Sequence, residues 1–267
     1  MGLDPSDETG RDPGRDCGRT PARGEPRARL AALRAQLAPP DEGRVLRPVL
    51  PLGLPALDDH LPGGGLALGP PHEIAPAGPA DGVAALGFAL ALCGLHLSRV
   101  SGQALIAAAP GEPLPYGHGL MGLGLDPGRL LLLEAGSDGE VFRALEAALH
   151  ARALAALIGL LRDGLPLKPG RRLQLAAEGP DPPLLLLLRP GEAELPNGAA
   201  TRWRIAAAPA SRDRFGTLDR PRWRARLERC RNGRGGDWLL EWDHAAHRLH
   251  LPEPLAGDAA ASGRSRA

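Results

Sequence analysis

Short apolar runs separated by helical patterns are the feature that most constrains how this chain can fold. Five consecutive leucines, Leu184–Leu188, are typical of a strand buried on both faces of a sheet. Similar short runs occur earlier, at His72–Ala75, Ala104–Ala109, Arg129–Leu133 and Leu157–Leu161. Helical patterns lie between them, at Val83–Leu97, after the capping-box spacing of Ser137 and Glu140, and at Arg171–Glu178. This alternation predicts parallel βαβ units, and therefore an α/β fold with a mostly parallel central sheet flanked by helices.

The pattern changes to strict alternation after Thr201. Apolar residues occupy every second position in three segments, those of Trp203 and Ile205, of Trp223, Ala225 and Leu227, and of Trp238, Leu240 and Trp242. Alternation with a period of two predicts strands that place one face on a core. Residues 232–236, Asn-Gly-Arg-Gly-Gly, predict a hairpin turn between two of these strands. We therefore expect antiparallel C-terminal strands added to the sheet, with three of the four tryptophans pointing into the core.

The two ends of the chain differ from this body in composition. Residues 1–42 are expected to be a disordered tail with one short helix at about 27–37, where Leu30, Leu33 and Leu37 form a narrow apolar stripe. That helix packs either on its own domain or on a partner. Residues 43–252 form the expected domain, and residues 253–267 a second disordered tail.

Composition excludes several classes of protein. Eight of the 267 residues are aromatic, too few for a surface that stacks nucleic-acid bases. The cysteines, Cys17, Cys93 and Cys230, are far apart and contain no CxxC pair, so we expect a cytoplasmic protein with neither a disulfide framework nor a zinc knuckle. The longest apolar run, Val83–Leu95, is too short to span a bilayer, and the N-terminus lacks the apolar core of a signal peptide.

Charge is distributed unevenly along the chain. Residues 48–198 carry a net charge of −6, whereas residues 199–234 carry eleven arginines against three acidic residues. Arg222, Arg224 and Arg226 should project from one strand face, widened by Arg202 and Arg204 if their strand is a neighbour. This arginine strip would bind a DNA backbone or an acidic partner, or it is simply a solvated face. His244, His247 and His250 are interpreted as surface or packing residues, so no metal is expected.

Residues 53–74 resemble the start of a RecA-type ATPase core, with a G-x-x-x-L-D motif, a glycine cluster and a short strand. The phosphate loop should follow Ile74. Gly78 and Gly82 lie in roughly the right loop, but Gly82-Val83-Ala84 stands where Gly-Lys-Ser/Thr is required. Lys168 is the single lysine among 32 basic residues, so no shift of the alignment restores the motif, and Asp81 adds negative charge beside the degenerate loop.

The other two parts of an ATPase site are also missing. Leu160 or Leu161 stands where a strand should end in a metal-binding aspartate, with Asp163 lying beyond it. Ala108-Ala109-Pro110 replaces the segment that presents a catalytic glutamate, with Glu112 nearby. These losses predict a RecA-like fold without ATP hydrolysis, not an enzyme, and without a cofactor.

A more specific resemblance rests on segments spread along the chain, at Leu61–Leu68, His72–Ile74, Tyr116–Leu120, Leu123–Pro127, Arg171–Glu178, Thr201–Trp203, Arg222-Trp223, Arg231–Gly236 and Glu241–Asp243. In these segments the chain resembles the ImuA family, RecA-like accessory proteins of bacterial mutagenic translesion synthesis. The resemblance implies a non-catalytic adaptor of the SOS damage response. It would bind ImuB, a Y-family polymerase relative, and support an error-prone DNA polymerase III α-type subunit, with RecA and DNA as further partners and no membrane contact. A nucleotide-binding regulator of RecA and a direct DNA-binding protein are the alternatives.

Overall fold

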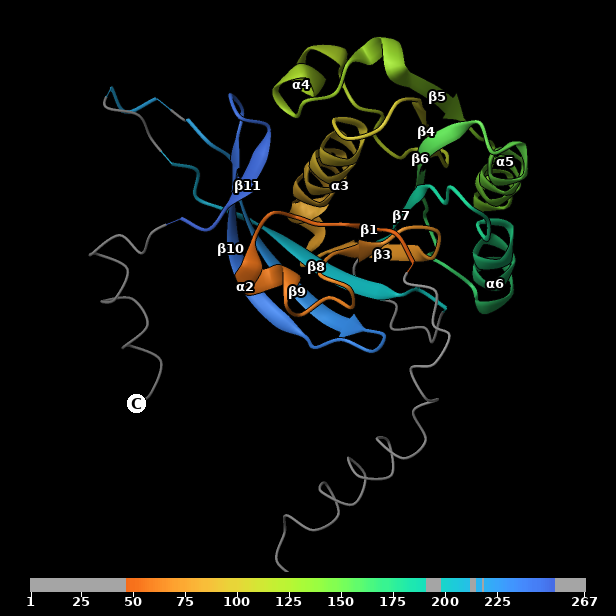
Figure 1. The fold of residues 1–267 in the computed structure, drawn as a ribbon. Coiled ribbons are helices and arrows are strands. Elements are labelled where there is room, and N and C mark those ends of the chain that lie inside the picture. Colours follow the sequence, from red (N-terminus) through yellow and green to blue (C-terminus); the bar gives the residue numbers. More distant parts are fainter. Residues whose placement is uncertain (1–46, 191–197, 212–214, 218, 253–267) are drawn as a thin grey trace, which may run out of the picture. The chain divides into compact units, whose positions relative to one another are not determined.

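A mixed sheet of nine strands forms the centre of the molecule (Figure 1). The computed structural model describes residues 47–190, 198–211, 215–217 and 219–252, so the predicted tails and the stripe of Leu30, Leu33 and Leu37 lie outside the described residues. The strand order is β11-β10-β9-β8-β3-β7-β6-β4-β5. The bounds are β3 Pro71–Pro76, β4 Gln103–Ala108, β5 Leu130–Glu134, β6 Leu154–Leu160, β7 Leu184–Leu188, β8 Thr201–Ala208, β9 Arg222–Cys230, β10 Gly236–Asp243 and β11 Arg248–His250.

The sheet is parallel from β5 to β8 and antiparallel from β8 to β11. The predicted α/β class, with a mostly parallel RecA-like sheet and antiparallel strands at the C-terminal end, is therefore confirmed. The strand of Trp203 has a double role, because β8 runs parallel to β3 and antiparallel to β9. A separate two-stranded ladder joins β1 (Val49–Leu50) to β2 (Leu66–Ala67).

Helices cover both faces of the sheet. Helix α3 (Gly82–Leu97) packs on one face, and α5 (Asp138–Ala151) and α6 (Leu167–Ala176) pack on the other (Figure 1). The shorter elements are α2 (Pro55–Asp58), α4 (Gly117–Gly122), and the 3-10 turns η1 (Pro79–Asp81) and η2 (Pro127–Arg129). The layers on the two faces create two apolar cores with the sheet between them.

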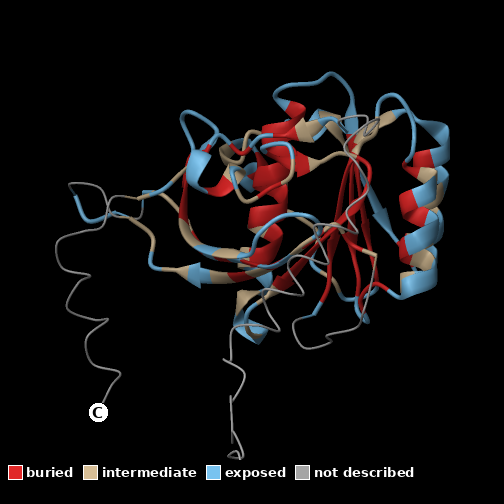
Figure 2. Ribbon diagram, turned by 60° about the horizontal axis from the view of Figure 1, so that its bottom comes forward, coloured by how far each residue is buried: buried red, intermediate tan, exposed pale blue. Residues whose placement is uncertain are grey.

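The core beneath α3 contains the aromatic residues of the C-terminal strands. Trp203, Trp223 and Trp242 are buried, and Phe88 of α3 lies 5.9 Å from Trp203 and 5.8 Å from Trp223 between ring centroids. Helix α3 is buried over most of its surface, whereas α5 alternates between buried and exposed residues (Figure 2). A Cβ at Gly94 of α3 would collide with the Leu123 carbonyl, so glycine is required where that loop crosses the helix.

Together with η1, helix α3 forms a 19-residue apolar segment, Pro79–Leu97, which is long and apolar enough to cross a membrane. The apolar run Val83–Leu95 that was identified in the sequence is shorter than this segment. In the folded chain, 67% of the 18-residue apolar window is buried against the sheet, as in the core helix of a folded domain.

Two elements begin at other residues than expected, and the start of a third has other hydrogen bonds than expected. Helix α6 begins at Leu167 rather than Arg171, because Pro169 falls in its first turn, where proline is tolerated. Strand β5 begins after Arg129, which closes η2. At the start of α5, Ser137 Oγ accepts from the Glu140 N–H at 3.3 Å, but Glu140 Oε2 accepts from the N–H of Gly136, one residue before the position that a capping box requires.

Candidate functional site

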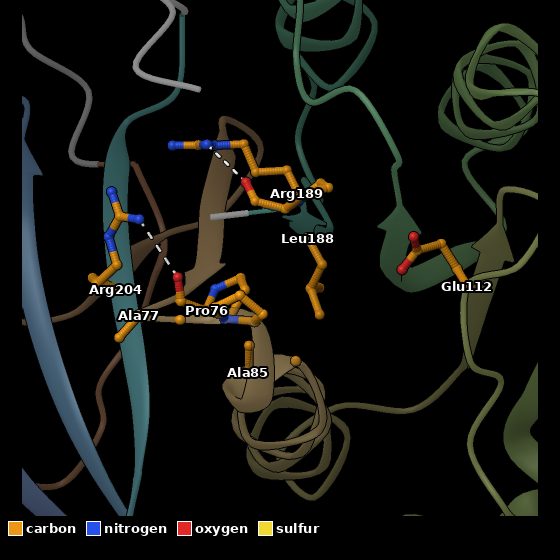
Figure 3. Close-up of a pocket in the computed structure, with 11 residues that line it drawn as sticks. Pro76, Ala77, Ala85, Glu112, Leu188, Arg189 and Arg204 are labelled. Atoms are coloured by element: carbon orange, nitrogen blue, oxygen red, sulfur yellow. Dashed lines mark hydrogen bonds between the residues drawn. The ribbon is translucent and has the colours of Figure 1, made fainter. Parts of the chain in front are cut away.

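A pocket of about 580 Å³ opens at the carboxyl ends of β3, β7 and β8 (Figure 3). This is the edge at which ligands bind in open α/β sheets. Its residues come from the loop after β3, the start of α3, the end of β7, strand β8 and the loop after β4; they are Pro76, Ala77, Gly78, Pro79, Gly82, Ala85, Glu112, Leu188, Arg189, Pro190 and Arg204. The structure therefore brings the two glycines of the degenerate loop together in one cavity.

The Asp81 carboxylate binds two backbone N–H groups beside this loop. Its Oδ2 accepts a hydrogen bond of 3.0 Å from the Gly78 N–H, and its Oδ1 accepts one of 2.9 Å from the Ala207 N–H of β8. In a phosphate loop such backbone N–H groups bind the ligand. Here the chain's own carboxylate binds one of them and ties the loop to β8.

The cations of the pocket are arginines that already hold carboxylates. Arg204 makes two hydrogen bonds to Glu228, at 3.0 and 3.2 Å, and contacts the Pro76 carbonyl at 3.5 Å (Figure 3). Arg189 donates from Nε to Glu73 and from Nη1 to the Pro190 carbonyl, while its buried Nη2 has no partner among the described atoms. Both guanidinium groups therefore share their charge with carboxylates of the chain.

Glu73 is the centre of a buried ion-pair cluster. Its side chain is 1% exposed and accepts from Arg189 Nε and, at 2.8 Å, from Arg202 Nε. The three residues lie on adjacent strands, with Arg202 opposite Glu73 in the β3–β8 register and Arg189 directly after β7. Sequence reasoning missed this cluster. A charged residue inside an apolar strand and an arginine after five leucines were the available signals, because such a charge needs a partner on a neighbouring strand.

The opposite wall of the pocket carries Glu112. Burial, followed by the nearby Asp138 carboxylate, raises its pKa, and Arg162 partly opposes this shift. Asp138 itself accepts from the N–H groups of Arg162 and Asp163, both at 2.9 Å, so the segment after β6 binds a carboxylate through its backbone. Among the residues that line the pocket, Glu112 is therefore the acidic one, and its charge would oppose that of a polyphosphate.

The arginines of the predicted strip lie on neighbouring strands, but three of the five form ion pairs with glutamates. Arg204 lies opposite Arg226 in the β8–β9 register. Arg222 donates to Glu241 at 2.7 Å, and Arg202 and Arg204 bind Glu73 and Glu228. Of the five arginines, Arg224 and Arg226 are exposed and make no ion pair with a described residue. Two uncompensated charges are a smaller phosphate-binding surface than five.

The C-terminal histidines do not share a strand face. His244 and His247 lie in the turn between β10 and β11, and His250 lies in β11. His244 Nδ1 bonds to the Gly122 carbonyl at 2.8 Å, and His250 Nε2 lies 3.6 Å from Asp243. Among the described residues no three His, Cys, Asp or Glu side chains gather as a metal-binding group.

Two known proteins are similar to this chain over most of its length. The chain is 39% identical to Protein ImuA of Caulobacter vibrioides, strain NA1000 / CB15N, over 220 residues that cover 78% of this chain and 88% of the relative. The chain belongs to the ImuA family. Protein ImuA of the strain ATCC 19089 / CIP 103742 / CB 15 gives the same identity and coverage. No family model matches the chain. The ImuA family suggested by the sequence motifs is thus confirmed by identity over most of this chain.

Proposed function

We propose that this ImuA-family chain is a non-catalytic RecA-like adaptor in the ImuA/ImuB mutagenic response to DNA damage, acting in the cytoplasm. It binds an ImuB-type protein and supports an error-prone DNA polymerase III α-type subunit, with RecA and DNA as further partners. The observation that carries the non-catalytic part is the loop of Gly78 and Gly82. This loop lacks the lysine, and its Gly78 N–H is bound by Asp81.

The partner is tested by capture of the ImuB-type protein of the same organism on the purified full chain. A second capture without residues 1–40 tests whether Leu30, Leu33 and Leu37 take part. Equal capture with and without residues 1–40 would remove that stripe from the interface. No capture by the full chain would contradict the adaptor function.

The non-catalytic part has its own test, in which the missing motif is restored. We expect the double variant Val83→Lys with Ala84→Thr to stay at background ATP hydrolysis, because Asp81 still binds the Gly78 N–H and no aspartate ends β6. Phosphate release is measured with magnesium against a mock preparation. Magnesium-dependent turnover by the wild-type chain would refute the proposal.

The pocket itself supports a second candidate, binding of a nucleotide without hydrolysis, because about 580 Å³ is within the usual size of small-molecule sites. Calorimetry with ATP and ADP tests it. A Cβ at Gly82 meets open space, so Gly82→Leu fills the pocket without backbone strain. The matched control is Gly119→Leu on α4, where a Cβ also meets no atom within 4 Å. If Gly82→Leu leaves the affinity for the nucleotide unchanged, the nucleotide does not bind in this pocket.

Within the predicted arginine strip, direct DNA binding is supported by the exposed Arg224 and Arg226. It predicts an affinity that falls steeply with salt and that falls again when both residues become alanine. Arg220→Ala is the control, because Arg220 lies beside the same strand but is occupied by Glu241 and Asp243. An equal loss in the control and in the double variant would exclude these two arginines as a specific contact.

A further inference from the structure

A cavity of about 450 Å³ lies at the amino ends of β6 and β7, whereas the pocket of Gly78 and Gly82 opens at the carboxyl end of β7. It is bounded by the last turn of α3, the loop from α5 to β6 and the loop that precedes β7. Four prolines line it, Pro48, Pro180, Pro182 and Pro183. Proline rings are rigid and apolar, so these walls suit a flat apolar ring.

One buried side chain of this cavity has an unused hydrogen-bonding atom. His96, in the last turn of α3, is 5% exposed, and its Nε2 bonds to the Ala155 carbonyl at 3.1 Å. A carbonyl only accepts, so Nε2 carries the proton and Nδ1 is an acceptor. Burial lowers the pKa of His96, opposed by the Ala155 carbonyl and assisted by Arg99, which keeps the ring neutral. Within the described part of the chain, Nδ1 has no hydrogen-bond partner.

This acceptor can be reached from the cavity. Among the described side chains, Arg189 Nη2 is the polar atom that is enclosed without a partner, so His96 Nδ1 is not fully enclosed. His96 itself lines the cavity. A ligand that fills the cavity with apolar groups alone would leave Nδ1 buried and unpaired, so the cavity favours a ligand with an O–H or N–H donor.

A smaller cavity, of about 80 Å³, adjoins the first and shares five of its lining residues, Arg152 and Asp181 among them. Both of these residues are exposed, and neither forms an ion pair with a described residue. Arg152 donates at 3.4 Å to the Glu178 carbonyl, so most of its five N–H donors remain available. Together, Arg152 and Asp181 offer a donor and an acceptor to the C=O and N–H groups of a peptide main chain.

We infer that the two cavities bind a tyrosine side chain of a partner protein, whose phenol O–H donates to His96 Nδ1 while its ring packs on the prolines. The main chain beside that tyrosine bonds to Arg152 and Asp181, and a small neighbouring side chain enters the smaller cavity. Tyrosine combines an apolar ring with one donor at its far end, which is why interfaces often use it as an anchor. This inference rests on the proposed function, because it assigns the site to the ImuB-type partner.

The structure favours a partner segment over the other sources of such a ring. Two adjoining cavities with a donor and an acceptor suit a peptide better than a free aromatic molecule, which would fill the larger cavity alone. A second copy of the chain could offer its single tyrosine, Tyr116, which is 76% exposed. However, α4 begins at Gly117, so the main chain after Tyr116 is helical and its N–H and C=O groups are directed along the helix.

The acceptor is tested with two amides that differ in one hydroxyl. N-acetyltyrosinamide and N-acetylphenylalaninamide are titrated against the isotope-labelled full chain, and the NMR signals of the Val100, Ala153 and Asp181 amides are followed. We expect the tyrosine amide to bind at least about threefold more tightly, because it alone donates to His96 Nδ1. His96→Phe, which keeps a ring at this position, should abolish the preference. Equal binding of the two amides to the wild-type chain would overturn the inference.

The partner is tested by blocking the larger cavity. Ala153 lines it and is exposed, so Ala153→Trp adds bulk at its rim. The matched control is Ala151→Trp, because Ala151 ends α5, is also exposed and lines neither cavity. We expect Ala153→Trp to weaken binding of the ImuB-type partner at least about tenfold, and the control to change it less than about twofold.

Failure of this inference differs from failure of the proposed function. Absence of any complex with the wild-type chain overturns the proposed function, and the inference with it. A complex that Ala153→Trp leaves intact, or that both tryptophan variants weaken equally, overturns the inference alone. If the preference for the tyrosine amide persists beside such an intact complex, the ligand is a free aromatic molecule. A free chain that is dimeric and becomes monomeric in both Ala153→Trp and Tyr116→Ala also overturns the inference, because the tyrosine then comes from a second copy.

Discussion

Glu73 shows how one buried charge holds several strands. Its carboxylate lies between Arg189 and Arg202, at the junction of β3, β7 and β8. Removing one member of a buried ion pair leaves the other charges without compensation. We expect Glu73→Ala to lower the free energy of unfolding by about 3–5 kcal/mol, as measured by urea denaturation. The exposed Glu134→Ala should change it by less than about 0.5 kcal/mol. An equal effect of both variants would show that the cluster is not stabilising.

His72 makes the stability depend on pH. It is fully buried, where Nε2 donates to the Ala67 carbonyl at 2.7 Å and Nδ1 accepts from the Thr201 hydroxyl at 2.8 Å. Burial lowers its pKa from 6.5 to about 4, against the weaker opposing effect of the Ala67 carbonyl. Between about pH 6.5 and pH 4 the His72 imidazole is therefore protonated in the unfolded chain and neutral in the folded chain. The free energy of unfolding consequently decreases as the pH falls from about 6.5 towards 4.

The expected loss attributable to His72 is at most about 3 kcal/mol across that window. Urea denaturation at about pH 7 and at about pH 4.5 measures it, with His72→Gln as the comparison. The variant should lose less stability between the two pH values than the wild type does. Burial also lowers the pKa of His96, which adds a change of the same sign to both proteins, so the difference between them isolates His72. Equal pH dependence in the two proteins would contradict the assignment.

At the scale of one element, the start of α5 depends on a single hydroxyl. Ser137 Oγ accepts from the Glu140 N–H, one of the donors that the first turn leaves without a partner. Ser137→Ala should lower the free energy of unfolding by about 1 kcal/mol. Thermal or urea denaturation measures this, and Ser101→Ala, at an exposed loop position, is the control. A Ser137→Ala protein as stable as the control would mean that α5 does not need this cap.

The elements also show what could be predicted from the sequence. Period-two alternation correctly placed Trp203, Trp223 and Trp242 in the core, because alternation depends only on strand geometry. The leucine runs predicted strands equally well at β5 and at β7. They could not distinguish an edge from a centre, because strand order is a long-range property.

The candidate site was predicted less completely. The loop of Gly78 and Gly82 was found from the motif it lacks, and it does line a pocket. The arginines of the strip were placed on the right face, but their carboxylate partners were missed. Glu228 and Glu241 are near in sequence to the strip and Glu73 is far from it, and only the register of β3, β8, β9 and β10 brings them into contact.

At the scale of the whole molecule, the described residues belong to one compact unit. The core beneath α3 extends from Leu50 to Leu249, so its described apolar contacts do not require the preceding residues. Deletion of residues 1–45 should therefore change the free energy of unfolding by less than about 0.5 kcal/mol in urea. A larger loss would show that the N-terminal residues are part of the stable fold.

The positions of the tryptophans have a practical consequence. All four lie in β8, β9 and β10, and none lies in β4, β5, β6 or β7. Intrinsic fluorescence of this protein is therefore an optical reporter of one end of the sheet, whereas far-ultraviolet circular dichroism averages over every helix and strand. A denaturation curve that differs between the two signals would reveal that the end beneath α5 and α6 separates from the tryptophan-bearing end before the molecule unfolds completely.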